Sequence, residues 1–175
     1  VYPSNASDAK GLLKMACRMN DPVLFMEHKG LYRQGYAATD EPDSDYIVPF
    51  GKGRLVSNGN YLTLVTWGAM VQKSVEAVQE LLLEENIVEI IDLRTLNPID
   101  FDILEVSINK TGKVLIVHED NLTNGPGAEI SAMISEKFFE YLDGPIKRVA
   151  AKDSPIPFNW VIEEKILPQT KDISN

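Results

Sequence analysis

The chain has 175 residues, 44% of them hydrophobic, and its 26 acidic against 17 basic residues give a net charge of −9. This length predicts one domain, or one domain with an appendage, that buries roughly 70% of its unfolded surface. The acidic balance argues against binding of nucleic acid, and it indicates either simple solubility or attraction to a basic protein partner. A single cysteine, Cys17, excludes an internal disulfide framework and fits a cytoplasmic location. No apolar run approaches the ~20 residues of a membrane span.

The first predicted element is a helix over residues 4–19. Ser4 or Asn5 can cap it, and Asp8 lies in its first turn, where a negative charge suits the helix dipole. Gly11 lies within the apolar stripe of this helix and costs up to about 1 kcal/mol in helix stability. Its presence therefore predicts close packing against a neighbouring segment.

A buried strand is predicted directly after this helix. Asp21-Pro22 ends the helix, and the apolar run 23–26 leads to Glu27-His28-Lys29. A helix and one strand cannot bury both of their faces alone. We therefore expect the pair to be the end of a domain whose larger part precedes Val1, so that the chain is a piece of a longer protein.

A linker is predicted next, because residues 30–50 are polar, acidic and interrupted by glycine and proline. We place a domain boundary near Pro49-Phe50-Gly51. The expected organisation is a remnant of a preceding domain over 1–33, a linker over 34–50 and one α/β domain over 51–175.

From Gly51 the pattern predicts alternating strands and helices. Strands 54–56 and 62–67 flank Asn58-Gly59-Asn60, a strong hairpin signal. A helix follows from Gly68 to about Glu85, with Val71, Val75, Val78 and Leu82 on one face. The remaining elements are strands at 88–92, 114–118 and 146–150, helices at 100–109 and 127–142, and a short helix near 162–166. This alternation predicts a three-layer α/β domain with a mostly parallel sheet.

Polar residues follow two of these strands at their carboxyl ends, where open α/β sheets gather ligands and partner contacts. Arg94 follows the strand that ends at Asp92; it can clamp a carboxylate, but an internal ion pair that fixes the loop leading to Pro98 is the preferred interpretation. His118 is expected to be a hydrogen-bonded strand-end residue rather than a general base. Arg94, His118 and Glu119 are the candidate interdomain or subunit contacts.

Other candidate sites are weaker. Gly125-Pro126-Gly127 precedes a helix and offers an anion site, although a tight turn that needs positive φ is the preferred interpretation. His28 and His118 lack the spaced partners of a metal site. Cys17 is expected to be a small buried hydrophobe. On residues alone, we expect no catalytic centre in this chain.

Several sequence blocks occur in an order that resembles a known family. This is the beta subunit of the thiamine-diphosphate-dependent decarboxylating component of 2-oxo acid dehydrogenase complexes, whose C-terminal domain is transketolase-like. The blocks are Asp21-Pro22-Val23-x-Phe25-x-Glu27-His28-Lys29-x-Leu31-Tyr32-Arg33, Trp67-Gly68-Ala69-Met70-Val71, Asp92-Leu93-Arg94-Thr95-Leu96-x-Pro98, His118-Glu119, Gly125-x-Gly127-Ala128-Glu129-Ile130 and Asp153-Ser154-Pro155-Ile156-Pro157.

The resemblance implies a fold and a function. Residues 1–33 would be the end of a pyrimidine-binding domain, and 51–175 a transketolase-like C-terminal domain. The intact enzyme would decarboxylate a 2-oxo acid, of branched-chain or pyruvate type, with thiamine diphosphate and Mg²⁺, and would acylate a lipoyl group. The family's cofactor-contacting residues lie upstream of the matched positions. The fragment is therefore expected to be inert alone and to serve in assembly.

The resemblance also implies partners and a cation. The partners are an alpha subunit or alpha half, a second beta subunit and the subunit-binding domain of the lipoyl acyltransferase core. Some members hold K⁺ at positions that align with Ala16, Met19 and Asp21.

Two alternatives stay open. One is a free-standing oligomerisation or docking module without catalysis. The other is a different transketolase-like enzyme, such as a sugar-phosphate transketolase, which the block 27–33 argues against.

Overall fold

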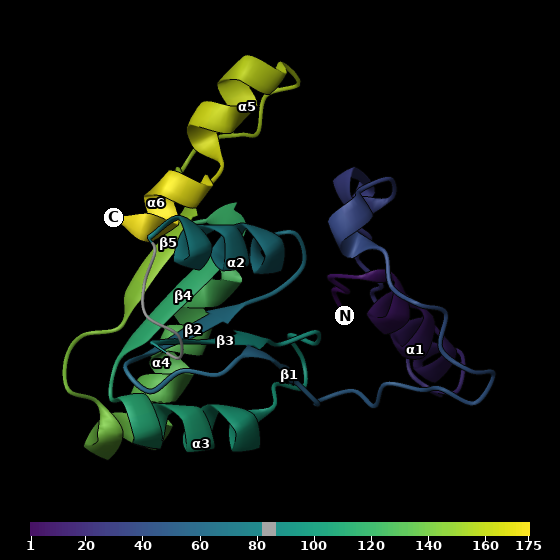
Figure 1. Cartoon of the computed structure of the whole chain (residues 1–175), viewed down its shortest axis with the longest axis horizontal. Coiled ribbons are helices and arrows are strands. Elements are labelled where there is room, and N and C mark those ends of the chain that lie inside the picture. The colour runs from purple at the N-terminus through teal and green to yellow at the C-terminus, as the bar shows by residue number, and fades with distance from the viewer. Residues whose placement is uncertain (82–86) are drawn as a thin grey trace.

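The structure is a computed structural model that describes residues 1–81 and 87–175. Two parts lie side by side (Figure 1). The first, the N-terminal segment (residues 1–50), contains helix α1 (Ala6–Ala16) and two short 3₁₀ helices, η1 (Lys29–Leu31) and η2 (Gly35–Ala37). The second is an α/β domain that contains the sheet.

A five-stranded sheet forms the centre of the second part. Its strands are β1 (Arg54–Ser57), β2 (Leu62–Thr66), β3 (Val88–Asp92), β4 (Val114–Asn121) and β5 (Lys147–Ala151). They lie in the order β1-β3-β2-β4-β5, with β1 antiparallel to β3 and the other pairs parallel. The predicted mostly parallel sheet is confirmed.

The predicted hairpin between residues 54–56 and 62–67 is wrong. Strand β3 lies between β1 and β2, and both pair with it. The connection 58–61 passes across the first residues of β3, and a Cβ on Gly59 would lie 2.2 Å from the backbone nitrogen of Glu89. Gly59 is therefore required for close backbone approach rather than for a two-residue turn.

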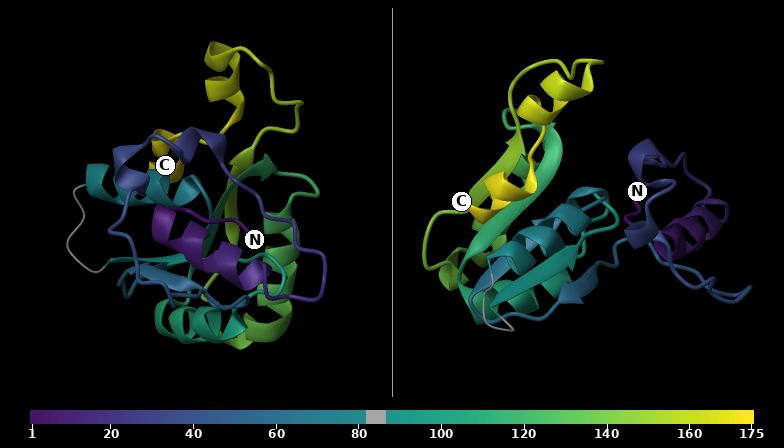
Figure 2. Two further views of the ribbon diagram at one scale, coloured as in Figure 1. Left: turned by 90° about the vertical axis from the view of Figure 1, so that its right-hand side faces the viewer. Right: turned by 45° about the horizontal axis from the view of Figure 1, so that its top comes forward.

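Helices cover both faces of the sheet, which confirms the three-layer prediction (Figures 1 and 2). Helices α3 (Phe101–Thr111) and α4 (Pro126–Phe138), the latter continued by η3 (Phe139–Tyr141), cover one face. Helices α2 (Met70–Glu80) and α6 (Thr170–Ser174) cover the other. The helix predicted from Gly68 extends to about Glu85, and α2 is described as far as Glu80. Residues 82–85 of the prediction, including Leu82, lie outside the described residues. Sequence reasoning missed α6 and anticipated α5 (Trp160–Ile166).

The core follows from apolar strands buried on both faces. All five residues of β3 are buried. Ile91 and Ile116 pack under α3 and α4, whereas Leu64 and Ile90 pack under α2. Such burial is typical of the inner strands of a parallel sheet. None of the helices in residues 1–81 and 87–175 combines the length and the apolar composition of a membrane span.

The predicted buried strand at residues 23–26 is wrong. The segment is irregular, and Leu24 is 81% exposed. The amine of Val1 donates to Leu24 O at 2.7 Å, and the backbone N–H of Met26 donates to Val1 O at 2.9 Å. These two hydrogen bonds pair the segment with the single residue Val1, and one residue is too short to form a β-ladder.

Two predictions for α1 are confirmed, namely its cap and its close packing. Asn5 caps the helix, and Gly11 lies against the side chains of Val48 and Tyr46.

Candidate functional site

The N-terminal segment packs against the carboxyl ends of β2, β3 and β4, and we call this contact the strand-end interface. The backbone N–H of Tyr2 donates to Arg94 O at 2.8 Å. Gly68, just after β2, adopts φ +57°, and a Cβ there would lie 2.5 Å from the Tyr2 ring. The segment thus occupies the edge at which α/β sheets place ligands.

Two buried acidic side chains and two partly buried basic side chains form a cluster at this interface. Arg94 Nη1 donates to Asp8 Oδ1 at 2.9 Å. Arg54 Nη2 donates to Asp92 Oδ2 at 3.1 Å, and its Nε lies 3.2 Å from Asp8 Oδ2 without forming a hydrogen bond. Ser4 Oγ donates to Asp92 Oδ2 at 2.6 Å. Both carboxylates are buried, so the opposing guanidinium charges compensate most of their desolvation.

The predicted internal ion pair of Arg94 is present, but its partner is Asp8 rather than the neighbouring Asp92. Arg94 adopts φ +57°, and its backbone N–H donates to Asp92 Oδ1 at 3.1 Å, while its side chain extends to Asp8. The same guanidinium donates to the carbonyl oxygens of Lys52 and Gly53. Burial raises the pKa of Asp92, although the hydrogen bond from Ser4 and the charge of Arg54 oppose that effect. Arg94 thus connects α1, the chain entering β1 and the end of β3.

A second ion pair crosses the strand-end interface. His28 Nε2 lies 3.1 Å from Glu119 Oε2, and both side chains are mostly buried. The hydrogen bond to Glu119 raises the pKa of His28 despite the opposing effect of burial. The structure thus places Glu119 opposite a histidine of the N-terminal segment, a pairing that sequence reasoning missed because the two residues are far apart in the chain.

His118 differs from its predicted environment. It lies within β4 rather than at its end, is fully buried, and neither ring nitrogen has a hydrogen-bond partner. The ring stacks on Trp67, with centroids 5.4 Å apart and planes 9° apart. Burial lowers the pKa of His118. The prediction of a hydrogen-bonded residue is therefore wrong, because aromatic stacking rather than hydrogen bonding holds the ring.

The two glycines at the start of α4 are explained by their contacts with His118 and with the backbone of β4. Gly125 has φ −72° and Gly127 lies inside α4, so the predicted positive φ is wrong; Asn124 carries it instead, at +61°. A Cβ on Gly127 would lie 2.3 Å from His118 Nε2, and one on Gly125 would lie 2.1 Å from the Asn121 carbonyl oxygen. These positions are glycine because the imidazole and β4 fill the adjacent space.

The two histidines are expected to titrate on opposite sides of the ordinary histidine value of about 6.5. Ring-proton NMR should place the pKa of His28 above it and that of His118 below it, and His28→Gln identifies the signals, since the chain contains two histidines. Protonated His28 contributes stability that is fully present below its unfolded pKa and is lost as the pH rises through its folded pKa. The effect of His118 on stability has the opposite dependence on pH. As the pH falls below its unfolded pKa, the unfolded chain binds a proton that the folded chain excludes, so stability falls. Titration of both histidines at the ordinary value would contradict this prediction.

The residues aligned with a potassium site lie around the end of α1. The Ala16 carbonyl accepts a hydrogen bond from the Met19 N–H at 3.1 Å, and Asp21 is exposed. Within residues 1–81 and 87–175, no group of three or more His, Cys, Asp or Glu is placed to hold a metal ion. A potassium site formed by carbonyl oxygens stays a prediction. Cys17, predicted to be buried, is exposed at the end of the same helix.

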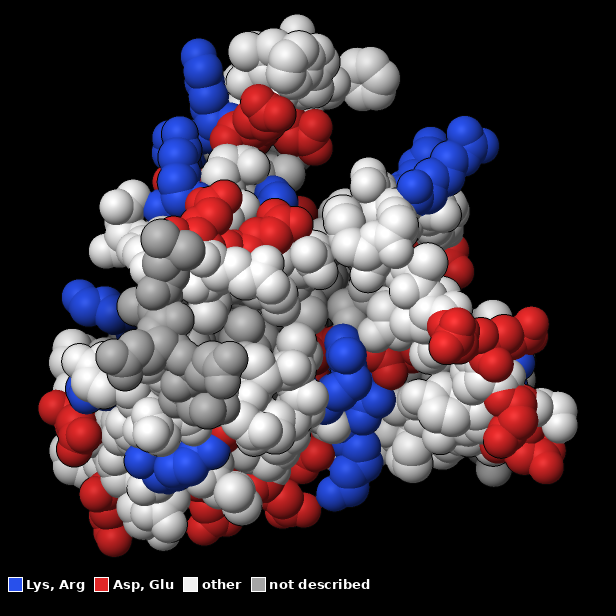
Figure 3. All heavy atoms as spheres, in the orientation of Figure 1, with Lys and Arg blue, Asp and Glu red and all other residues white. Residues whose placement is uncertain are grey.

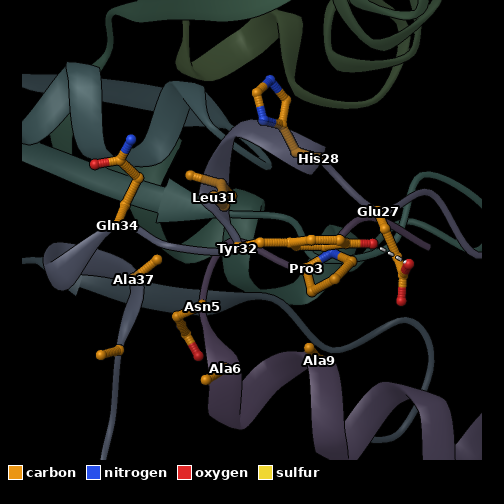
Figure 4. Close-up of a pocket in the computed structure, with 11 residues that line it drawn as sticks. Pro3, Asn5, Ala6, Ala9, Glu27, His28, Leu31, Tyr32, Gln34 and Ala37 are labelled. Carbon is orange, nitrogen blue, oxygen red and sulfur yellow. Dashed lines mark hydrogen bonds between the residues drawn. The ribbon is translucent and has the colours of Figure 1, made fainter.

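A hollow of about 330 Å³ lies within the N-terminal segment, and we call it the N-terminal pocket. Its lining is mainly apolar and includes Pro3, Ala6, Ala9 and Leu31. Tyr32 lies beside Pro3, and its hydroxyl donates a hydrogen bond to Glu27 (Figure 4). Glu27 and His28 also line it, and His28 is paired with Glu119, so the remaining apolar part of the lining suits an apolar group.

Comparisons with known proteins agree with this geometry. The family described as transketolase, C-terminal domain, matches residues 51–173. The chain is 43% identical over 173 residues to the pyruvate dehydrogenase E1 component subunit beta of Staphylococcus epidermidis, a match that covers 99% of this chain and 52% of that protein. The corresponding Staphylococcus aureus subunit is 42% identical over the same length. A solved split-gene transketolase, described as an inactive beta4 tetramer, superimposes with a TM-score of 0.75 at 25% identity, covering 98% of this chain and 53% of that one. The chain thus spans about half the length of the curated relatives it matches.

Proposed function

The chain belongs to the transketolase C-terminal domain family, and on this premise we propose that it forms the C-terminal half of the beta subunit of a 2-oxo acid dehydrogenase. The proposal is supported by 43% identity to the staphylococcal E1 beta subunit over nearly the whole chain. The intact enzyme would decarboxylate its substrate with thiamine diphosphate and Mg²⁺ and acylate a lipoyl group. We propose pyruvate rather than a branched-chain 2-oxo acid as the substrate, because the relatives are named as pyruvate dehydrogenase subunits.

The described residues do not fit the cofactor or its metal. The buried carboxylates of Asp8 and Asp92 are already compensated by Arg54 and Arg94. In the described ranges, no further acidic or histidine group has the spacing of a metal site. Binding of the diphosphate therefore belongs, in this proposal, to the alpha subunit and to the preceding half of the beta subunit.

The role that we assign to this chain is assembly. The observation that carries this assignment is the strand-end interface, where every charged group of the Asp8, Arg54, Asp92 and Arg94 cluster has an opposite charge beside it. Such a cluster orients one segment on another and leaves no group free for acid–base chemistry. It would set the position of the pyrimidine-binding domain, of which residues 1–33 are the end, relative to the C-terminal domain.

The proposed partners are an alpha subunit, a second beta subunit and the subunit-binding domain of the acyltransferase core. The net charge of −9 supports a basic partner, which it would attract over long range. A solved relative is itself described as a tetramer of beta chains. We place the enzyme in the cytoplasm, supported by the single unpaired cysteine.

A chimaera tests this function. The C-terminal half of the Staphylococcus epidermidis beta subunit, over the aligned residues, is replaced by this chain and co-expressed with the staphylococcal alpha subunit. We expect thiamine-diphosphate-dependent release of CO₂ from pyruvate by the chimaera and none by the isolated chain. The branched-chain substrate 2-oxoisovalerate serves as the specificity control.

Two outcomes would overturn the proposal. Decarboxylation by the isolated chain would show that its own residues hold the cofactor. A folded chimaera that binds the alpha subunit but releases no CO₂ would favour a docking module without a catalytic role.

A further inference from the structure

Strand β5 forms one edge of the sheet. In the order β1-β3-β2-β4-β5, strand β4 pairs with one side of β5, and the described ranges place no strand on its other side. Figure 1 shows β5 as the outer strand, with α5 and α6 near its carboxyl end. An edge strand presents unpaired backbone N–H and C=O groups, with which another chain can pair. The free side of β5 is therefore a candidate for contact with a further polypeptide.

Two hydrogen bonds at the end of β5 establish which of its backbone groups face outward. The carbonyl oxygen of Ala151 accepts from the N–H of Leu122, which follows β4, at 2.9 Å. The N–H of Lys152 donates to the carbonyl oxygen of the last residue of α5 at 3.1 Å. Successive residues of a strand direct their backbone groups to opposite sides, so those of Arg148 and Ala150 point away from β4, as the Lys152 N–H does. These two residues are therefore available for pairing with an added strand.

A hollow of about 860 Å³ borders this free side, and we call it the β5 groove. Its lining includes the three consecutive residues 148–150. Because the side chains of a strand alternate between the two faces of a sheet, this lining indicates that the hollow runs along the edge of β5. The other lining residues come mainly from α5, α6 and the segment between them, and include the apolar residues Val161, Ile166 and Leu167. All of the lining lies between residues 122 and 172, so the groove is complete without the N-terminal segment.

The β5 groove is rich in basic side chains, although the chain as a whole has a net charge of −9. The four basic residues that line it are Arg148, Lys152, Lys165 and Lys171, against the two acidic residues Glu164 and Asp172. Within residues 1–81 and 87–175, none of these four basic side chains forms an ion pair. The Asp172 carboxylate instead caps α6 by accepting from the N–H of Gln169 at 2.8 Å. Figure 3 shows basic side chains at the upper left of the view, beside α5 and α6. The groove therefore favours a partner that carries carboxylates.

We propose that the β5 groove binds an extended, acidic polypeptide segment, which pairs with β5 as an additional strand of the sheet. The backbone groups of Arg148 and Ala150 supply the hydrogen bonds of the pairing, which give affinity in this mode of peptide recognition. Asp and Glu side chains of the segment meet the four basic side chains of the groove and give specificity. Apolar side chains at alternate positions of the segment contact Val161, which is 42% exposed.

The charges on β5 disfavour a second copy of this strand as the partner. Lys147 and Arg148 lie at its start, and Lys152 follows it, so two copies paired edge to edge would bring like charges together. The proposed partner also differs from the basic partner that the net charge of the chain favours. The proposal goes beyond the proposed function and does not depend on it, because the groove belongs to the α/β domain alone.

The test is binding of the fluorescein-labelled peptide (Glu-Val)₄-Glu to the 175-residue chain, measured by fluorescence anisotropy. We expect its dissociation constant to rise by roughly tenfold or more in the variant Lys152→Glu/Lys165→Glu, because two attractive contacts become repulsive. The matched control is Arg18→Glu/Lys29→Glu, which changes the net charge equally at two exposed side chains outside the groove. This control should leave the dissociation constant unchanged. Circular dichroism confirms that each variant is folded.

Two further peptides separate strand pairing from attraction by charge alone. (Glu-Pro)₄-Glu has the same charge but lacks the N–H group at every proline, and (Lys-Val)₄-Lys has the same pattern with the opposite charge. Both should bind roughly tenfold more weakly or worse. In the ¹⁵N-labelled chain, (Glu-Val)₄-Glu should slow amide hydrogen exchange at Arg148 and Ala150, whose N–H groups face the groove. The amide of Val149 faces β4 and should exchange at an unchanged rate.

Four outcomes would overturn the proposal. The first is no binding of (Glu-Val)₄-Glu at about 1 mM, the weak limit of specific affinity. The second is binding of (Glu-Pro)₄-Glu or (Lys-Val)₄-Lys that is as tight as that of (Glu-Val)₄-Glu. The third is an equal loss of affinity in the groove variant and in the control variant. The fourth is unchanged exchange at both Arg148 and Ala150 in the complex, a measurement that uses the unaltered chain and needs no variant to fold.

Discussion

Arg94→Ala should lower the free energy of unfolding by about 3–5 kcal/mol, as expected when one partner of a buried ion pair is removed. The Arg94 side chain is 12% exposed and donates to Asp8 and to two backbone carbonyl oxygens. Its loss leaves Asp8, which is 2% exposed, with Arg54 as its remaining guanidinium neighbour. Urea denaturation measures the stability, and amide hydrogen exchange of α1 should accelerate because the helix loses its attachment to the end of β3.

Two further variants separate charge from backbone strain. Arg94 adopts φ +57°, a conformation that costs a residue with a Cβ about 1–2 kcal/mol relative to glycine. Arg94→Gly should therefore be less destabilising than Arg94→Ala by about 1 kcal/mol. Arg18→Ala, at an exposed arginine, should change stability by less than about 0.5 kcal/mol. Equal effects of Arg94→Ala and Arg18→Ala would show that the buried cluster contributes nothing.

Gly127→Ala should destabilise the protein by about 1–3 kcal/mol, the usual range for overpacking. Destabilisation is the opposite of the usual result, because alanine inside a helix is normally favoured over glycine by roughly 1 kcal/mol. At this position in α4 the new methyl group would lie 2.3 Å from His118 Nε2. The imidazole cannot move away easily, because Trp67 stacks on it.

A double-mutant cycle with His118→Ala isolates this contact. In the His118→Ala background, Gly127→Ala should be neutral or stabilising, since the methyl group then occupies vacated space. Gly144→Ala is the matched control, because no neighbouring atom lies within 4 Å of the added Cβ. An undiminished cost of Gly127→Ala without the imidazole would contradict this explanation.

Elements with a strong local pattern were predicted well. Strand 88–92 matches β3, since a short β-branched run bounded by polar residues is apolar enough to be buried on both faces. The helix predicted at 100–109 matches α3, where Asp100 caps the first turn and Gly112 ends the helix at φ +65°. In both cases the sequence pattern that indicates the element lies within a few residues along the chain.

Predictions that depend on distant partners were less successful. The hairpin 54–67 has a strong turn signal, yet β3 pairs with both of its strands. Residues 23–26 are apolar enough for a strand, but strand formation also needs a neighbouring strand with free backbone groups. Arg94 pairs with Asp8, which lies 86 residues away in the chain, and the His118 ring stacks on Trp67 instead of forming the expected hydrogen bond.

The sequence by itself determined the class of the domain, the positions of most of its elements and the polar residues at the ends of β3 and β4, because hydrophobic periodicity and helix caps are local properties. Only the tertiary structure decided the strand order, the pairing of Arg94 with Asp8, the pairing of His28 with Glu119 and the burial of His118 beside Gly127. These contacts join residues that are distant in sequence or that meet only after α4 docks on the sheet. The free energies of these contacts depend on which groups the fold brings together away from water. A local sequence pattern does not contain that information.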